Sequence, residues 1–544
     1  MIKIRPKKVK LKHRIYKLID ISGLQLFDPV ARLFFREEPQ VQIKRIMQFI
    51  VIPILAFGLF LLVWQIMAPR HTTKSGEVPK PGRVLDAAKG IWTFHNREKE
   101  KSIAFIASSD EANKILDNAK NRLEEIESSL IPAQDETIAN LEILEQEWRD
   151  KNISPKIKKA ANIEYEINSK QNSLKTELEE LAGSIKANDK NAKEELVLRL
   201  EKLELQKSKW KIELAELKGT ISILESKKYP LLERAQRKKD RLEEEKQYLS
   251  VYIGILTKNR NSKVEELNKK LVDYSNSFYA AESTKVMSSA KRLVRQKTRI
   301  EKTSESQYSA AKTLPYQTLR SLLCVFTGFI IATIVAIPLG ILCGLNKTFM
   351  CAFTPFIAIF KPVSPIVWLP IGLIVVGGFI PDPENNALLS IINKLPIFSS
   401  FDVNPAFLAS AITVALCSLW PTLVNTALGV SSIDVDHLNV ARVLNLRFRE
   451  RLISVIIPSA LPLIFAGLRI SIGVGWMVLI AAELLASSEG IGKFVWDMFN
   501  NGSSDSFAQM FVVVFLVGGI GLLLDRIMIV FQRLVSFDET APSV

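Results

Sequence analysis

Six long apolar stretches constrain this chain of 544 residues more than any other feature of its sequence. An α-helix needs about 20 apolar residues to cross the hydrocarbon core of a bilayer. The first stretch covers residues 46–67 and is interrupted only by Gln48 and Gln65. The others cover residues 321–345, 363–380, 406–430, 463–485 and 507–530. We therefore expect an all-α, polytopic membrane protein with six transmembrane helices.

A charge-dense segment separates the first stretch from the second. Residues 101–310 hold 40 Lys and Arg and 36 Asp and Glu, of 72 and 57 in the whole chain. This uneven distribution excludes a single globular core for the whole chain. We expect the segment to be a soluble insertion between two transmembrane helices.

Apolar residues in this segment recur at alternating steps of four and three. One series comprises Leu196, Leu200, Leu203, Trp210, Leu214, Leu217, Ile221, Leu224, Leu231, Ala235, Leu242, Leu249, Tyr252 and Leu256. A shorter series comprises Leu116, Ala119, Leu123, Ile126 and Leu130. Heptads flanked by Glu and Lys are typical of coiled coils. Both ends of the segment return to the membrane, so we expect antiparallel arms. Their tip is expected near residues 187–191 or, alternatively, at residues 152–155; a folded-back four-helix stack is a further possibility.

Basic residues near the first stretch predict the orientation of the chain. The first 17 residues carry eight Lys and Arg and no acid, and Lys44 and Arg45 precede the stretch directly. Such residues stay in the cytoplasm, so we expect both termini and the loop 431–462 inside and the segment 69–316 outside. Anionic lipid accounts for the basic N-terminus, so no nucleic-acid partner is expected.

No catalytic or metal site is expected from the residue types that usually build one. The four cysteines lie within or beside apolar stretches, and the four histidines are scattered along the chain. Residues 490–493 read GIGK, but Phe494 stands where a phosphate-binding loop needs Ser or Thr. The chain is therefore expected not to be an enzyme and to hold no cofactor itself.

The loop between the fourth and fifth stretches carries the most specific motif. Residues 439–445 read NVARVLN, nine residues follow, and residues 455–458 read VIIP. This spacing is similar to the EAA loop of ABC importer permeases, which reads EAA, three residues, G, nine residues and I-x-L-P. Asn439 and Val440 stand where that motif has Glu and Ala, and Asn445 where it has Gly. Asn also adopts the left-handed backbone conformation that Gly serves.

Further segments resemble the nitrate/sulfonate/bicarbonate (taurine-type) subfamily of these permeases. They are residues 78–81 (VPKP), 362–370 (PVSPIVWLP), 437–444 (HLNVARVL), 456–462 (IIPSALP), 467–470 (GLRI) and 481–485 (AAELL). The resemblance covers about residues 46–93 and 317–535 and excludes the insert.

The resemblance implies the permease subunit of an ABC importer in the bacterial inner membrane. It implies a second permease copy, a periplasmic solute-binding protein, and cytoplasmic ATPase subunits that bind ATP and Mg. It also implies a small, anionic solute moved by alternating access. The chain would then comprise a basic cytoplasmic segment (1–45), a first transmembrane helix (46–68), a periplasmic segment (69–316) with a coiled-coil insert at about 97–312, a permease core (317–535) and a cytoplasmic tail (536–544).

Two groups of candidate site residues follow. In the subfamily the EAA loop docks on the ATPase, which assigns that role here to Asn439, Val440, Ala441, Arg442, Leu444, Asn445, Val455, Ile457 and Pro458. As two short helices joined by a turn, the loop would present Val440, Ala441 and Leu444 as an apolar face and Arg442, Arg447 and Arg449 as its rim. The translocation-path candidates are Pro362, Pro365, Pro370, Arg469 and Glu483. Helix kinks, an inner-end snorkelling Arg469 and an interfacial charge at Glu483 are the alternative interpretations.

Two other functions stay open. The chain could be an envelope organiser or sensor that acts through its coiled coil, or a degenerate permease retained for assembly, because Asn439 has replaced the Glu of the motif.

Overall fold

The computed structural model describes Tyr16, Ile19 and residues 27–68, 72–73, 76–185, 190–225, 229–383, 386–398, 401, 403–486 and 488–535. The chain divides into two compact units. Met1–Asn96 and Ala311–Val544 form the first, which we call the membrane unit. Arg97–Ala310 form the second, which we call the insert unit.

Helices make up nearly all of the membrane unit, as expected. They are α2 (Asp28–Phe34), α3 (Pro39–Ile46), η2 (Met47–Val51), α4 (Ile52–Met67), α13 (Leu314–Leu345), α14 (Lys347–Phe360), α15 (Pro365–Phe379), α16 (Ala387–Lys394), α17 (Pro405–Ser431), α18 (Val435–Val443), α19 (Phe448–Arg451), η5 (Leu452–Ile456), α20 (Ile457–Ala486), α21 (Ile491–Asn501) and α22 (Ser504–Val535). Helix α5 (Pro81–Ile106) continues into the insert unit. The short strands β1 (Thr72–Thr73) and β2 (Gly76–Glu77) pair antiparallel.

Five helical runs in the described chain are long and apolar enough to cross a bilayer. They are Pro39–Met67, Leu314–Leu345, Pro405–Ser431, Phe448–Ala486 and Asp505–Val535. The crossing expected at residues 363–380 is the 15-residue helix α15, which is short for a bilayer. Helices α14 and α15 together pass as a sixth candidate, bent by 102°. The described chain thus has five candidate crossings, or six if the bent pair is one.

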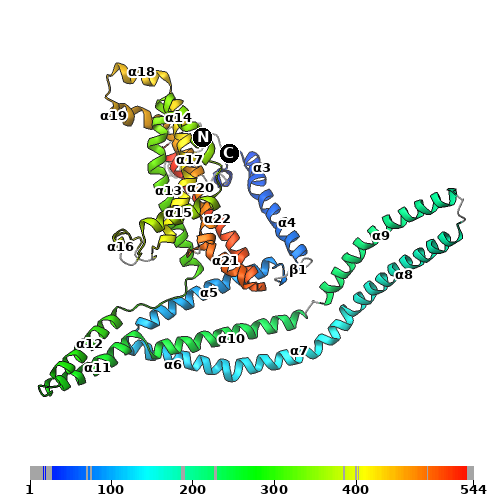
Figure 1. The fold of residues 1–544 in the computed structure, drawn as a ribbon, viewed down its shortest axis with the longest axis horizontal. Coiled ribbons are helices and arrows are strands. Elements are labelled where there is room, and N and C mark those ends of the chain that lie inside the picture. The colour runs from blue at the N-terminus through cyan, green and yellow to red at the C-terminus, as the bar shows by residue number, and fades with distance from the viewer. Residues whose placement is uncertain are drawn as a thin grey trace, which may run out of the picture. The chain divides into compact units, whose positions relative to one another are not determined.

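Helix α17 packs closely against α13 on one side and α20 on the other (Figure 1). A Cβ atom on Gly328 of α13 would lie 2.5 Å from the carbonyl oxygen of Ala411 on α17. On α20, a Cβ atom on Gly475 would lie 2.7 Å from Ser418 Oγ of α17. Lipid tails are as apolar as Leu side chains, so transmembrane helices associate through such close packing of small residues. These three helices form the core of the membrane unit.

The first candidate crossing packs far less than the others. Its most apolar window has a mean hydropathy of 2.7 and is 0% buried within the chain. Trp64 of α4 stacks on Phe511 of α22 with ring centroids 5.3 Å apart. The rest of α4 is therefore an apolar surface suited to lipid.

Antiparallel helix pairs form the insert unit (Figure 1). Its helices are α6 (Ser109–Glu125), η4 (Ile126–Leu130), α7 (Ile131–Asn152), α8 (Ser154–Ser184), α9 (Lys190–Glu225), α10 (Pro230–Thr257), α11 (Arg260–Tyr279) and α12 (Val286–Glu305). Helices α6 and α7 pack on α10, α8 packs on α9, and α11 packs on α12.

The long hairpin reverses between α8 and α9, because these consecutive helices pack on each other. The tip expected at residues 187–191 falls in this connection, of which residues 186–189 lie outside the described residues. The alternative tip at residues 152–155 is wrong. There the chain passes from α7, which packs on α10, to α8, which packs on α9.

The apolar series largely predicts which side chains are buried between the arms. Ile126 and Leu249 are 0% and 7% exposed. Beyond Pro230 the expected register holds, since Ala235 and Leu256 are 7% and 3% exposed. The exception is Leu231, which is 49% exposed, whereas its neighbour Leu232 is 4% exposed. Proline at the first position of α10 starts a new helix, and Leu231 lies in its first turn.

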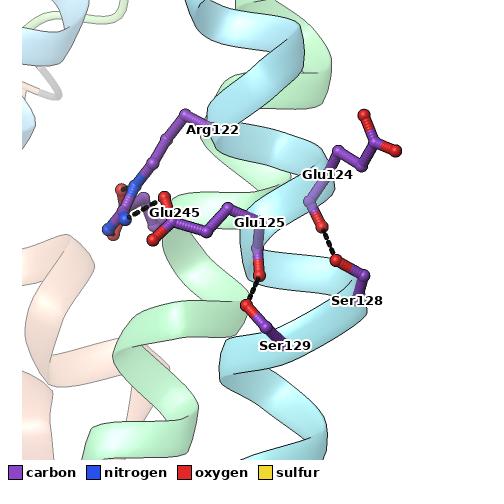
Figure 2. A network of polar contacts seen from close by, with 6 residues as sticks. All are labelled: Arg122, Glu124, Glu125, Ser128, Ser129 and Glu245. Carbon is purple, nitrogen blue, oxygen red and sulfur yellow. Dashed lines mark hydrogen bonds and ion pairs between the residues drawn. The ribbon is translucent and has the colours of Figure 1, made fainter.

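Glu245 lies between Leu242 and Leu249 of this series and pairs with a cation across the hairpin (Figure 2). Its Oε1 lies 2.9 Å from Nε of Arg122, which also pairs with Glu125. These bonds raise the pKa of the Arg122 guanidinium, first through Glu245 and then through Glu125. One turn on, Ser128 and Ser129 donate to the carbonyl oxygens of Glu124 and Glu125 at 2.6 Å, within the wide turn of η4 (Figure 2).

We expect Gly328→Ala to destabilise the membrane unit, because the added methyl group meets the backbone of α17. Overpacking of this kind costs about 1–3 kcal/mol. The matched control is Gly518→Ala on α22, where a Cβ atom meets nothing within 4 Å. Thermal unfolding of the purified chain in detergent should show a lower midpoint for Gly328→Ala alone. Equal midpoints for the two variants would contradict the close contact.

Candidate functional site

Helix α18 and the short α19 form the loop that carries the EAA-like motif, and they lie together at one end of the membrane unit (Figure 1). Asp434 caps α18 by accepting a hydrogen bond from the N–H of Asp436 at 3.0 Å. Asn439, which stands in place of the motif's Glu, accepts a hydrogen bond from Arg442 at 3.4 Å. The altered motif therefore still lies within a regular helix, which begins four residues before Asn439.

Asn445 ends α18 in the left-handed conformation, with a φ of 49°. Its N–H donates to the carbonyl oxygen of Arg442 at 2.9 Å, and the N–H of Leu446 donates to that of Ala441 at 3.1 Å. These two bonds are the Schellman arrangement, in which Gly is usual and Asn is tolerated. The expectation that Asn445 performs the turn of the motif's Gly is confirmed.

After the turn, the chain returns to the helical core of the membrane unit through α19, η5 and α20. Glu450 accepts a hydrogen bond from the N–H of Arg447 at 2.8 Å, which fixes the start of α19. Val455 lies in η5, and Ile457 and Pro458 open α20. All three motif positions therefore lie in one continuous helical run that leads into the core.

The exposed apolar face of α18 differs from the expected one. Val440 and Leu444 are 58% and 64% exposed, as a docking face requires. Ala441 is 1% exposed, so its assignment to this face is wrong. Val443, which sequence reasoning left out, is 85% exposed. At 100° per residue, Val440, Val443 and Leu444 share one side of α18, and we call them the α18 face.

The three proline candidates surround the bend between α14 and α15. Pro362 lies in the turn between the helices, Pro365 begins α15, and Pro370 lies within α15. Ser364 has an extended backbone, as a residue before proline favours. These prolines thus account for the 102° bend.

Arg469 pairs with a carboxylate that sequence reasoning did not single out. Its Nε and Nη2 lie 2.5 Å and 3.1 Å from the two carboxylate oxygens of Asp525 on α22. The pair lies in an open groove of about 610 Å³ between α20 and α22, which Ile470, Gly473 and Met477 also line. Asp525 falls inside the sixth apolar stretch, and an ionisable residue there was the available signal.

Glu483 is 1% exposed, so its interpretation as an interfacial charge is wrong. Both carboxylate oxygens accept hydrogen bonds from the Ser321 hydroxyl of α13, at 2.6 Å and 2.8 Å. The N–H of Gly492 donates to it at 3.1 Å. A Cβ atom on Gly490 would lie within 2.4 Å of the Glu483 carboxylate, so a larger residue there would displace this carboxylate. Glu483 therefore fastens the start of α21 to α13 and α20.

Arg320, the residue before Ser321, holds the same connection and was also missed by sequence reasoning. It is 2% exposed and donates to Ser488 Oγ at 3.1 Å, to Asn404 Oδ1 at 3.3 Å, and to the carbonyl oxygen of Glu489. A lone Arg beside an apolar stretch gives no sequence signal for partners this far along the chain.

Glu489 adds an ion-pair cluster outside the apolar helices. Partial burial raises the pKa of its carboxyl, but Lys493 and Lys312 outweigh burial and leave it below the usual value. Lys493 Nζ lies 2.9 Å and Lys312 Nζ 3.5 Å from Glu489 Oε1. A depressed pKa means that this contribution to stability is present at neutral pH and is lost as the pH falls through the folded-state pKa.

Comparison with known proteins now identifies the membrane unit. Residues 336–537 match the family described as "Binding-protein-dependent transport system inner membrane component". The nitrate import permease protein NrtB of Synechococcus elongatus is 34% identical over 42% of this chain and 71% of its own length. This chain belongs to that family. It is the non-catalytic, multi-pass inner membrane permease of a binding-protein-dependent ABC transporter.

Other relatives agree with this assignment. The bicarbonate transport system permease protein CmpB of Synechococcus elongatus is 36% identical over 41% of this chain and 69% of its own length. The chain also aligns with a solved structure of the MetNI methionine ABC transporter in inward-facing conformations, with a TM-score of 0.31 and 14% sequence identity. This alignment covers 40% of this chain and 93% of the solved chain.

We expect Ser321→Ala to destabilise this permease by about 1–3 kcal/mol, because it leaves the buried Glu483 carboxylate short of a donor. Denaturant or thermal unfolding in detergent measures the change. The matched control is Asp505→Asn, since the Asp505 side chain is 80% exposed where it pairs with Arg83. Exposed pairs contribute about 1 kcal/mol at most. A Ser321→Ala protein as stable as the control variant would show that the Glu483 network does not support the fold.

Proposed function

We propose that this permease moves a small anion across the inner membrane by alternating access, powered by ATPase subunits that dock on the α18 face. Nitrate and bicarbonate, named for the two relatives, are both small anions. The net charge of the chain is +15, and its basic N-terminus contributes notably to it. This charge is compatible with binding to anionic lipid, so it is no argument for an anionic solute. The anionic solute therefore rests on the relatives.

The α18 face is the observation that carries the docking proposal. Val440, Val443 and Leu444 expose apolar side chains at one end of the membrane unit, on a helix held rigid by the turn at Asn445. Arg449 of α19 is also exposed, and Arg442 is exposed on another side of α18. An apolar helix side with a charged rim is the usual occupant of a groove on a partner protein. We assign the groove to the ATPase. The other motif residues, Asn439, Ala441, Val455, Ile457 and Pro458, would shape the loop that carries the α18 face.

The path candidates divide into two roles. Pro362, Pro365 and Pro370 set the bend of α14 and α15, and we propose that this bend lines the path. Arg469 with Asp525 faces the open groove between α20 and α22, where it can meet an anion or a second permease copy. Glu483 is enclosed, so we propose that it positions the start of α21 and does not contact solute in this conformation.

We propose the predicted topology for the remaining parts. Both termini and the α18–α19 loop lie in the cytoplasm, and residues 69–316 lie in the periplasm with a coiled-coil insert at about residues 97–312. The permease core covers residues 317–535. The long hairpin of α6 to α10 would contact the binding protein, the envelope or a second copy of the insert.

We expect the double variant Val440→Asp, Leu444→Asp to lose its ATPase. Two carboxylates on the α18 face would be buried without partners in the docked complex, which costs several kcal/mol. Co-purification of the ATPase from mild detergent measures the loss. The control is Val435→Asp, which is 65% exposed on the same helix but lies on another side. Retention of the ATPase by the double variant would exclude docking through this face.

We expect removal of residues 97–312 to leave ATPase binding intact and to lower solute uptake. The ends of the deletion lie close together, because His95 Nδ1 is 2.8 Å from Thr313 Oγ1, so a short Gly-Ser linker closes the gap. Uptake by cells and ATPase co-purification are the two measurements. Unchanged uptake would mean that the insert has no transport role. Loss of the ATPase as well would contradict the independence of the two units.

A further inference from the structure

The hairpin of α11 and α12 has a surface that transport does not explain. Helix α12 carries six Lys and Arg and two Glu. Its side toward α11 is apolar or neutral, with Leu267 of α11 8% exposed and Gln296 of α12 donating to the Leu267 carbonyl oxygen at 2.8 Å. The basic side chains are thus distributed over the rest of the α12 surface.

Most of these cations share one side of α12. At 100° per residue, five of them fall within a sector of about 100°. They are Lys291, Arg292, Arg295, Arg299 and Lys302, and we call them the basic stripe. The two Glu residues, Glu301 and Glu305, fall outside this sector. The stripe therefore presents one sign of charge along the helix.

The basic stripe lacks ion pairs within the described chain, whereas the rest of the insert unit has many. Arg122, Lys239 and Lys246 all pair across the long hairpin. Glu266 of α11 has its pKa lowered chiefly by its hydrogen bond to Lys270, and Arg299 of the stripe is the smallest of the causes. The stripe is thus available to an external anionic surface.

Apolar side chains are exposed at the tip of the same hairpin. Tyr279, the last residue of α11, is 82% exposed, and Met287, near the start of α12, is 68% exposed. Val286 is 38% exposed, and Phe278 makes an edge-to-face contact with Tyr279, with ring centroids 5.4 Å apart. Within the described chain, the Tyr and Met side chains at this turn are therefore not stabilised by burial.

We propose that the α11–α12 hairpin binds the surface of an anionic phospholipid bilayer, with the tip entering the headgroup region and the basic stripe contacting lipid phosphates. Apolar side chains next to Lys and Arg are the combination that binds membrane interfaces. Each Lys or Arg near an anionic surface adds roughly a fivefold gain in binding. A soluble acidic protein or nucleic acid would use the stripe and would leave the apolar tip unexplained.

The membrane in question is the one that the permease itself crosses. Residues 306–313 are the chain between α12 and the transmembrane helix α13. Eight residues span at most about 28 Å, and α12 itself adds about 30 Å. The hairpin is therefore tethered within reach of that bilayer, on whichever side α13 begins. The inference is independent of the transported solute.

Hydrogen–deuterium exchange of the full-length chain in nanodiscs tests this inference. One set of discs contains phosphatidylcholine alone, and the other contains equal parts of phosphatidylcholine and phosphatidylglycerol. We expect amides of residues 278–290 to exchange several-fold more slowly in the anionic discs at low salt and to lose this protection at high salt. Equal exchange in both sets of discs would overturn the proposal.

Variants separate the two parts of the surface. We expect the slower exchange of residues 278–290 in anionic discs to be abolished in the triple variant Lys291→Glu, Arg295→Glu, Lys302→Glu. The matched control, Lys202→Glu, Lys209→Glu, Lys211→Glu, makes the same change of charge on exposed positions of α9 and should keep it. Tyr279→Ser, Met287→Ser should weaken protection without altering the exchange of α12 in neutral discs, which shows that the hairpin still folds.

Two outcomes would contradict the proposal directly. Loss of protection in the α9 control would mean that net charge, and not the stripe, decides binding. Protection of residues 278–290 by added DNA in neutral discs, together with none by anionic lipid, would assign the stripe to a soluble polyanion.

Discussion

Close backbone contact of α17 with α13 and α20 is the constraint on which the membrane unit depends. Gly328 and Gly475 allow it, because side chains at these positions would collide with α17. The two ends of this three-helix core carry the two functional features. At one end α17 leads through Asp434 into α18, and the chain returns to α20 through α19 and η5. At the other, Glu483 and Ser321 fasten α20 and α13 to α21. A displacement of α18 is therefore transmitted to α17 and α20 together.

The spacing of the EAA-like motif predicted those parts of the α18–α19 loop whose structure depends on the local backbone. The nine-residue interval after Asn445 fixed both the helix end and the re-entry at Pro458, because a left-handed turn and a helix start are local features. The side on which Ala441 lies was not predictable. It depends on which side of α18 packs against η5, and that is decided by tertiary contacts. Val443 is exposed for the same reason.

Long-range polar partners could not be predicted from the sequence, for a different reason. Glu483 lies 162 positions from Ser321, and Arg469 lies 56 positions from Asp525. Helical periodicity within one apolar stretch carries no information about which other stretch lies beside it. The insert shows the same limit locally, since its heptads predicted the buried series along α10 but not the exposure of Leu231 in the first turn of that helix. Periodicity thus predicts helices and faces, and packing decides partners.

The attachment of the insert limits how it can act on the permease. His95 and Thr313 are hydrogen-bonded, so the insert enters and leaves the membrane unit at one place. A force that the chain carries from the insert therefore acts on the core at one place, along α5 and α13. Arg83 of α5 pairs with Asp505 at the start of α22, and Arg320 of α13 holds the connection before α21. Both routes meet the same end of α20, α21 and α22. Any signal from the insert, including contact of its α11–α12 hairpin with lipid, would thus reach the Glu483 network before it reaches the α18 face.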